Sequence, residues 1–261
     1  MNVMSTVKEL SYCCTKNLHY VTCIIIGLLS VTAFGNFQMF VSKQSLSFWD
    51  SRTSVLSRFL WDLLLLITFI VQHSLMASSW FKVQMSSWLN ISISERLIYL
   101  TVSSCTLLIV ITQWNSIPEV YLWLVDTQRH FLLWLFFLLL HVTAWLLMCL
   151  EIILMDCGEL LGFSQIYNHY NSLPWPMSKK ARMLREIYSR MRHPGAILLT
   201  AMLWLHPLMT LDRLILACTL TSYIIGRHSF EMVHYEFAEK YFTLKTFQRE
   251  SSVSYDYITE S

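Results

Sequence analysis

The sequence predicts an all-α fold, a polytopic transmembrane helix bundle of about six spans. Composition is the first observation behind this expectation. Of 261 residues, 55% are hydrophobic and 14% charged, and the mean hydropathy is +0.47, whereas soluble domains carry about 25% charged residues. The second observation is that several apolar runs reach the length of about 20 residues that crosses a hydrocarbon core.

Four long apolar runs predict four spans, and two shorter runs predict a closing helical hairpin. The long runs are Leu18–Val41, Phe59–Met76, Leu97–Trp114 and Phe131–Leu154. The first is longer than the apolar region of a signal peptide, so we expect it to remain as an uncleaved span. The short runs are Ala196–Met209 and Leu214–Gly226, with a tight turn at 211–213. A re-entrant pair that does not fully cross is the alternative for these two.

The distribution of basic residues predicts the orientation of these spans. In the six-span arrangement, most of the 19 lysines and arginines fall on the side that carries both termini. Basic residues are retained on the cytoplasmic side, so both termini should face the cytoplasm or nucleoplasm. We expect residues 1–250 to form one integral membrane domain, and residues 251–261 a disordered polar tail.

The long polar segment and the cysteines have simple interpretations. Residues 178–192 alternate basic and apolar side chains at helical spacing, which predicts an amphipathic helix on an anionic leaflet. The seven cysteines are odd in number, and several lie within apolar runs. They fit neither a disulfide framework nor a zinc-ligand spacing, so no metal site is expected.

Polar side chains inside the spans are the first candidates for a site, because each requires a partner or a cavity in a membrane. Asp62 and His73 are 11 residues apart and share a helix face. Spans two and four both run towards the inner side, which places Gln72, His73 and Glu151 near the inner leaflet. The candidates for a polar cavity are Gln72, His73, His141, Glu151, Glu159 and Gln165. The alternative is that they form interhelical hydrogen bonds that hold the bundle together.

The local sequence Arg192-His193-Pro194 precedes the fifth run. Proline is favoured at the first helical position, which leaves amide donors at the helix N-terminus. Together with Arg192 and the positive end of the helix dipole, these donors could receive a carboxylate or another anion. The end of the sixth run brings His228 and Glu231 to the same side.

Several motifs, in this order and spacing, resemble the nurim family. They are Trp61-Asp62, Gln72-His73-Ser74-Leu75-Met76, His141-Val142 with Trp145-Leu146-Leu147, Glu159-Leu160-x-Gly162-x-x-Gln165-x-Tyr167, Arg192-His193-Pro194, and Asp212-Arg213-Leu214 followed by Tyr223. The resemblance implies a multi-pass protein of the inner nuclear membrane with no established enzymatic activity or cofactor. It extends from the second apolar run to the last.

This family is in turn distantly similar to isoprenylcysteine carboxyl methyltransferases, which bind S-adenosylmethionine with an Arg-His-Pro motif. That similarity makes Arg192, His193, Pro194, His228 and Glu231 the candidate cofactor-binding residues. Two departures are visible, because Ala196 stands where a tyrosine is expected and Glu231 is not part of a glutamate pair.

Three functions are therefore open. A structural protein of the nuclear envelope is favoured, with the lipid bilayer and other nuclear envelope proteins as partners and no direct nucleic-acid binding. An S-adenosylmethionine-dependent membrane methyltransferase is the alternative. A lipid- or haem-binding protein is a third interpretation, in which His73 and His141 would serve as axial ligands.

Overall fold

The computed structural model describes residues 3–44, 53–78, 80–81, 84–85, 95–154, 157–171 and 194–226. The chain divides into two compact units, Met1–Ala217 and Cys218–Ser261. The first unit contains the helices and strands discussed below. In the second unit, the described residues 218–226 continue a helix that begins at residue 211.

Within the described residues, four helices are long and apolar enough to cross a membrane. They are α1 (Val3–Ser42), α2 (Val55–Ala77), α4 (Glu95–Thr112) and α5 (Phe131–Leu154). In the most apolar stretch of each, at most 22% of the residues are buried within the protein. Their exposed faces are rich in leucine, isoleucine and valine. Soluble proteins rarely expose a contiguous apolar surface of this extent to water. The predicted transmembrane helix bundle is thus confirmed.

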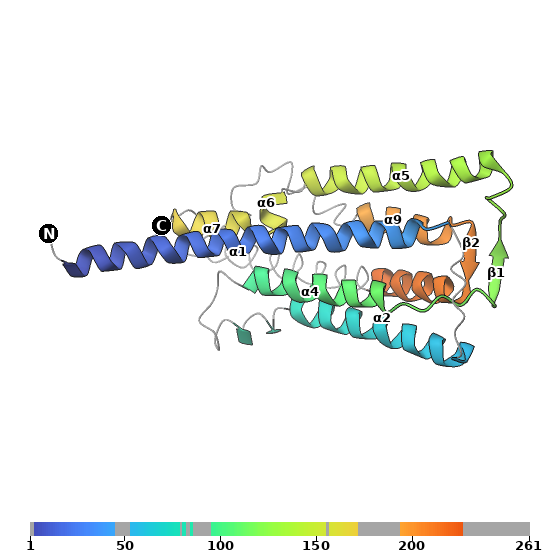
Figure 1. Ribbon diagram of the computed structural model, residues 1–261, viewed down its shortest axis with the longest axis horizontal. Coiled ribbons are helices and arrows are strands. Elements are labelled where there is room, and N and C mark those ends of the chain that lie inside the picture. The colour runs from blue at the N-terminus through green and yellow to red at the C-terminus, as the bar shows by residue number, and fades with distance from the viewer. Residues whose placement is uncertain are drawn as a thin grey trace, which may run out of the picture. The chain divides into compact units, whose positions relative to one another are not determined.

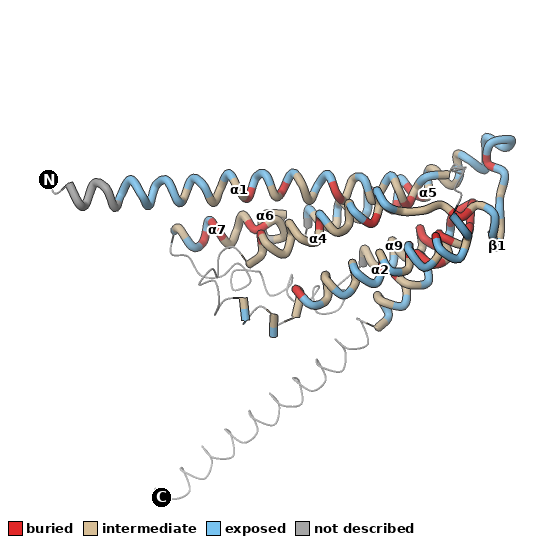
Figure 2. Tube along the Cα trace, turned by 60° about the horizontal axis from the view of Figure 1, so that its bottom comes forward, coloured by how far each residue is buried: buried red, intermediate tan, exposed pale blue. Residues whose placement is uncertain are grey.

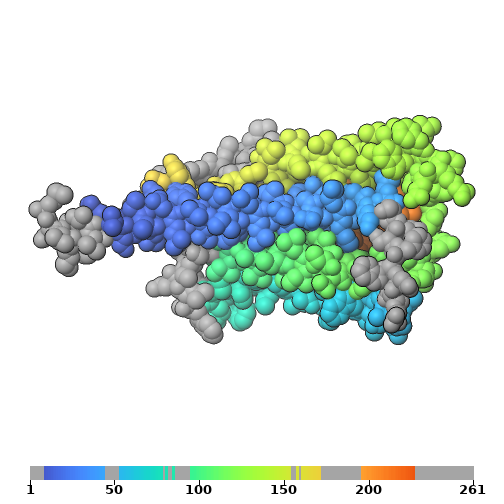
Figure 3. Space-filling view, in the orientation of Figure 1, coloured from blue at the N-terminus to red at the C-terminus, as the bar shows by residue number. Residues whose placement is uncertain are grey.

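Helices α1, α2, α4 and α5 run in alternating directions (Figure 1). Helix α4 packs against both α1 and α2, while α5 packs against α9 (Pro194–Trp204). Figure 3 shows α1 lying between α4 and α5 along one face. This alternation agrees with the order of the apolar runs in the sequence.

A short antiparallel strand pair closes one end of the first unit. Strand β1 (Tyr121–Leu124) follows α4, and β2 (Leu208–Thr210) follows α9. We call this the β end of the bundle and define it by these two strands. Buried residues are concentrated near β1 (Figure 2), and they include Met202, Met209 and Asp212.

The strand pair changes the expected hairpin in one detail. The turn between the two short runs lies at residues 205–210, whereas 211–213 form the first turn of the following helix. Pro207 explains the difference, because proline removes a helical donor and disfavours helix for the residue before it. Helix α9 therefore ends at Trp204, and its 11 residues span about 16 Å. The count of six full spans stays a prediction.

Two short helices, α6 (Cys157–Leu160) and α7 (Phe163–Tyr170), follow α5 at the opposite end. Gly162 joins them with φ of 89°, a left-handed conformation that favours glycine. Ile166 of α7 packs with Cys23 of α1 and Leu97 of α4 in a buried cluster. The amphipathic helix expected at 178–192 and the tail at 251–261 lie outside the described residues.

Candidate functional site

Gln72 and His73, near the end of α2, bind side chains of α4. The Gln72 amide donates to Ser103 Oγ at 3.3 Å, and its carbonyl accepts from Thr106 Oγ1 at 2.9 Å. The His73 ring lies 3.1 Å from the Tyr99 hydroxyl and stacks on Phe69. These contacts join two neighbouring helices, which is the interhelical role that the sequence left open as the alternative to a cavity.

The Glu151 carboxylate stands at the N-terminus of α9. A Cβ placed on Gly195, the second residue of that helix, would lie 2.7 Å from Glu151 Oε2. Free amide groups and the positive end of the dipole make this position favourable for an anion. Glu151 of α5 thus lies close to the position next to Pro194 where an anion is predicted.

The other predicted cofactor residues cannot be placed. Arg192, His193, His228 and Glu231 lie outside the described residues, and Pro194 begins α9. Glu159 belongs to α6, and the half-buried Gln165 belongs to α7. The structure thus brings Glu151 to the start of α9, and the assembly of the full set of candidate groups stays a prediction.

His141 lies nearer the β end than Glu151, by ten residues or about 15 Å along α5. Its Nδ1 atom is 3.0 Å from Ser42 Oγ, which also accepts a hydrogen bond from the Trp145 indole at 2.7 Å. The ring meets His206 edge to face, with 5.4 Å between ring centroids. Within the described residues, no group of three or more histidine, cysteine, aspartate or glutamate side chains could hold a metal ion.

His206 is the second buried histidine at this end, and sequence reasoning missed it. Its side chain is 2% exposed, and its Nδ1 atom is 2.9 Å from the Leu208 carbonyl oxygen and 3.1 Å from the Leu208 amide nitrogen. Burial lowers the pKa of His206 to about 3. The ring is therefore neutral at physiological pH, and the histidine next to Pro207 could have indicated a structured turn.

Two buried aspartates hold the segment between α4 and β1. Asp62 is fully buried, and its Oδ1 accepts from the Asn115 amide nitrogen at 3.0 Å. The Asp212 carboxylate accepts from the Ile117 amide at 3.1 Å and from the Trp114 indole at 3.2 Å. Each aspartate thus accepts hydrogen bonds from backbone or indole donors that would otherwise be buried without acceptors.

Two arginines complete this polar network at the β end. Arg58 donates to the Ser116 carbonyl at 2.8 Å and to Glu119 Oε1 at 2.6 Å. Arg213 donates to the carbonyl oxygens of Val41 and Lys43 at 3.1 and 2.6 Å. The guanidinium of Arg58 holds the pKa of the Glu119 carboxyl below its usual value. Arg58 thus joins α2 to the loop after α4, and Arg213 joins the helix that begins at residue 211 to the end of α1.

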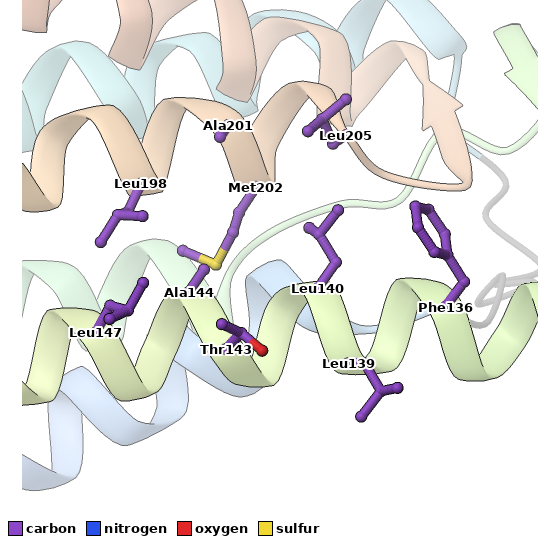
Figure 4. Close-up of a pocket in the computed structure, with 10 residues that line it drawn as sticks. All are labelled: Phe136, Leu139, Leu140, Thr143, Ala144, Leu147, Leu198, Ala201, Met202 and Leu205. Carbon is purple, nitrogen blue, oxygen red and sulfur yellow. The ribbon is translucent and has the colours of Figure 1, made fainter.

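An apolar cavity of about 420 Å³ lies between α5 and α9. Figure 4 shows Met202 of α9 and Leu140 of α5 projecting into the space between the helices, with Phe136 near the β end. Among the ten described residues that line it, Thr143 is the one polar residue. These residues suit a hydrocarbon chain, and none of those described offers a charged group to a polar cofactor.

Comparisons with known proteins identify relatives of this chain. Nurim from Bos taurus is 34% identical over 181 residues, which cover 68% of each chain. Nurim from Homo sapiens is 33% identical over the same length and coverage. A nurim homolog from Drosophila melanogaster is 35% identical over 163 residues, covering 62% of this chain and 64% of the relative. No protein-family model and no solved structure matches the chain. With more than 30% identity over two thirds of both chains and with four helices long enough to cross a bilayer, the protein belongs to the nurim family of multi-pass membrane proteins.

Proposed function

We propose that the protein is a structural protein of the inner nuclear membrane that performs no catalysis. Its membership of the nurim family supports the location, because the family resemblance implies the inner nuclear membrane. The termini face the nucleoplasm in this arrangement, and the partners are the bilayer and other nuclear envelope proteins.

The observation that carries the structural role is the internal pairing of buried polar side chains. Gln72 binds two hydroxyl groups of α4, Asp62 binds Asn115, and Glu151 lies at the start of α9. Each of these groups is a candidate for chemistry by residue type. Each is instead used to join one element of the bundle to another, as polar groups commonly do between membrane helices.

Location is tested with the full-length chain carrying an epitope tag at its C-terminus. We expect staining of the nuclear rim after all membranes are permeabilised, and none when the plasma membrane alone is opened. A tag placed between Asp126 and Arg129, at the β end, should need permeabilisation of the nuclear membranes as well. Staining throughout the endoplasmic reticulum that is accessible after plasma-membrane opening would contradict the proposal.

The absence of catalysis is tested by ligand binding. The purified full-length protein should show no saturable binding of S-adenosylmethionine under conditions in which its thermal unfolding remains cooperative. Saturable binding that Arg192→Ala weakens would favour the methyltransferase alternative. Arg129→Ala is a matched control, since Arg129 is exposed at the β end and forms an ion pair with Asp126.

A further inference from the structure

One face of α1 is exposed along its whole length and carries polar side chains at membrane depth. Its residues recur every three or four positions, so they lie in one line along the helix. They are Leu18, Val21, Ile25, Leu28, Thr32, Asn36 and Met39, which are all exposed. We call them the outer face of α1. We propose that this face binds the outer face of α1 in a second copy of the protein, which gives a parallel dimer.

The opposite face of α1 packs on the rest of the first unit. Cys23 and Val41 are 0% and 1% exposed, and Cys23 contacts Leu97 and Ile166 in a buried cluster. Thr32 is nine residues from each of the two buried residues, or about two and a half turns, which places it on the other side of the helix. Figure 2 shows α1 along one edge of the first unit. The outer face is therefore left for lipid or for a partner.

Asn36 lies within the hydrocarbon core of the membrane. The depth follows from Ser30, whose Oγ accepts a hydrogen bond from Ser104 at 3.1 Å. Ser104 is near the middle of α4 (Glu95–Thr112), so Ser30 marks the middle of the bundle. Asn36 is six residues, or about 9 Å, further along α1, whereas half of a hydrocarbon core is about 15 Å.

The carboxamide of Asn36 retains hydrogen-bonding capacity at this depth. Its Nδ2 atom donates to the Thr32 carbonyl oxygen at 2.8 Å. Among the described residues this is its one hydrogen bond, which leaves a second N–H and the carboxamide oxygen. Lipid offers neither a donor nor an acceptor, and polar groups inside membranes usually face another helix. A partner with a matching polar group is therefore favoured over lipid.

A second copy supplies that group at the right depth. Two copies in one membrane share their orientation, so their α1 helices are parallel, and each residue of the outer face meets its own counterpart across a two-fold axis. A carboxamide is both donor and acceptor, so each Asn36 donates its second N–H to the carboxamide oxygen of the other. The spacing of three and four residues is the one that lets parallel helices interlock, and a buried asparagine fixes their register.

Two adjacent cysteines provide a cross-linking test in the natural sequence. Cys14 is four residues before Leu18 and extends the outer face, whereas Cys13 points about 100° away from it. Both thiols are exposed. Copper phenanthroline oxidises two thiols to a disulfide when their Cα atoms come within about 7 Å, and oxygen takes up the electrons and protons.

The full-length protein is reconstituted in liposomes and treated with this oxidant. We expect a disulfide-linked dimer on a non-reducing gel. Cys14→Ser should reduce its yield at least about tenfold, because the disulfide forms on the outer face. Cys13→Ser is the matched control and should leave the yield unchanged.

The strength of association tests the role of Asn36. Energy transfer between copies labelled at their C-termini is measured as the liposomes are diluted with lipid. Asn36→Leu should raise the dissociation constant about tenfold, since it removes the hydrogen bonds between the two helices. Thr68→Leu is the control, because Thr68 is exposed on α2 and its hydroxyl donates to the Leu64 carbonyl of its own helix.

Three results would overturn the proposal. A monomer at every protein-to-lipid ratio would assign the outer face to lipid or to a different protein. A disulfide-linked dimer that persists in Cys14→Ser would place the contact elsewhere. An unchanged dissociation constant for Asn36→Leu, with its thermal unfolding still cooperative, would show that the carboxamides do not meet. If Asn36→Leu does not fold, the comparison of Cys14→Ser with Cys13→Ser decides.

Discussion

The buried Asp212 carboxylate offers the sharpest test of how the β end is held together. It accepts two hydrogen bonds from the segment after α4, from the Ile117 amide and the Trp114 indole. Asp212 is 5% exposed, and Ile117 is fully buried. Replacing Asp212 with alanine leaves the amide and the indole without acceptors where water has little access.

The expected cost follows from these two bonds. Hydrogen bonds to a charged group contribute about 1.5 to 3 kcal/mol each, and an unpaired buried donor costs about 1 to 3 kcal/mol. Asp212→Ala should therefore lower the free energy of unfolding by about 3 kcal/mol. Asp212→Asn should cost about half as much, since its carbonyl can serve one of the two donors while its amide cannot accept from the other.

The assay is unfolding of the detergent-solubilised full-length protein by increasing mole fractions of sodium dodecyl sulfate. Asp126→Ala is the matched control, because Asp126 is 43% exposed and accepts from the amides of Gln128 and Arg129 in a local turn. A double-mutant cycle with Trp114→Phe should give a coupling of about 1 kcal/mol to Asp212. Equal midpoints for Asp212→Ala and Asp126→Ala would refute the reasoning.

Three further predictions concern other parts of the chain. Gly195→Ala should displace Glu151 from the start of α9 and cost about 1 kcal/mol in the same assay. Gly35→Ala is its control and should not destabilise, because nothing lies within 4 Å of a Cβ there and alanine favours helix. The pKa of His206 is lowered to about 3, so the unfolded chain binds a proton below pH 6.5 that the folded one does not. The free energy of unfolding should therefore fall as pH drops from 6.5 towards 3, by up to about 1.4 kcal/mol per pH unit. In the His206→Asn variant, the melting temperature should depend less on pH over this range. Tyr170→Phe should release α7 from α1, because the Tyr170 hydroxyl lies 2.6 Å from His19 Nδ1; hydrogen exchange in α7 should rise while that in α2 stays unchanged.

The long helices could be predicted from the sequence, except that α1 begins 15 residues before the run Leu18–Val41. The run Phe131–Leu154 coincides with α5, and the runs for α2 and α4 differ from the helices by a few residues at each end. Apolar length is a local property, and a membrane-spanning segment must satisfy its backbone hydrogen bonds within itself. Its boundaries therefore follow from composition, without knowledge of the neighbouring helices.

The polar residues were harder to interpret, because residue type does not specify a partner. Glu151 was expected to line a polar cavity. In the structure it lies at the start of α9, next to Gly195, which is 44 positions later in the chain. Asp62 was expected to need a partner within a span. Nothing in the sequence indicates that this partner is Asn115, which lies in an irregular segment. Nothing in the sequence indicates that Arg58 and Arg213 bind carbonyl oxygens of residues far away in the chain, as both do in the structure.

The sequence by itself determined the class of protein, the long helices and their order, because hydropathy and segment length act residue by residue along the chain. Its motifs also pointed to the nurim family, which the comparisons confirm. The tertiary structure alone decided which polar groups meet, where the short α9 ends, and that the loops at the β end are tied together by buried aspartates and arginines. These features depend on contacts between residues far apart in the chain. The energy of a buried charge is set by the groups around it, and only the folded arrangement determines those groups.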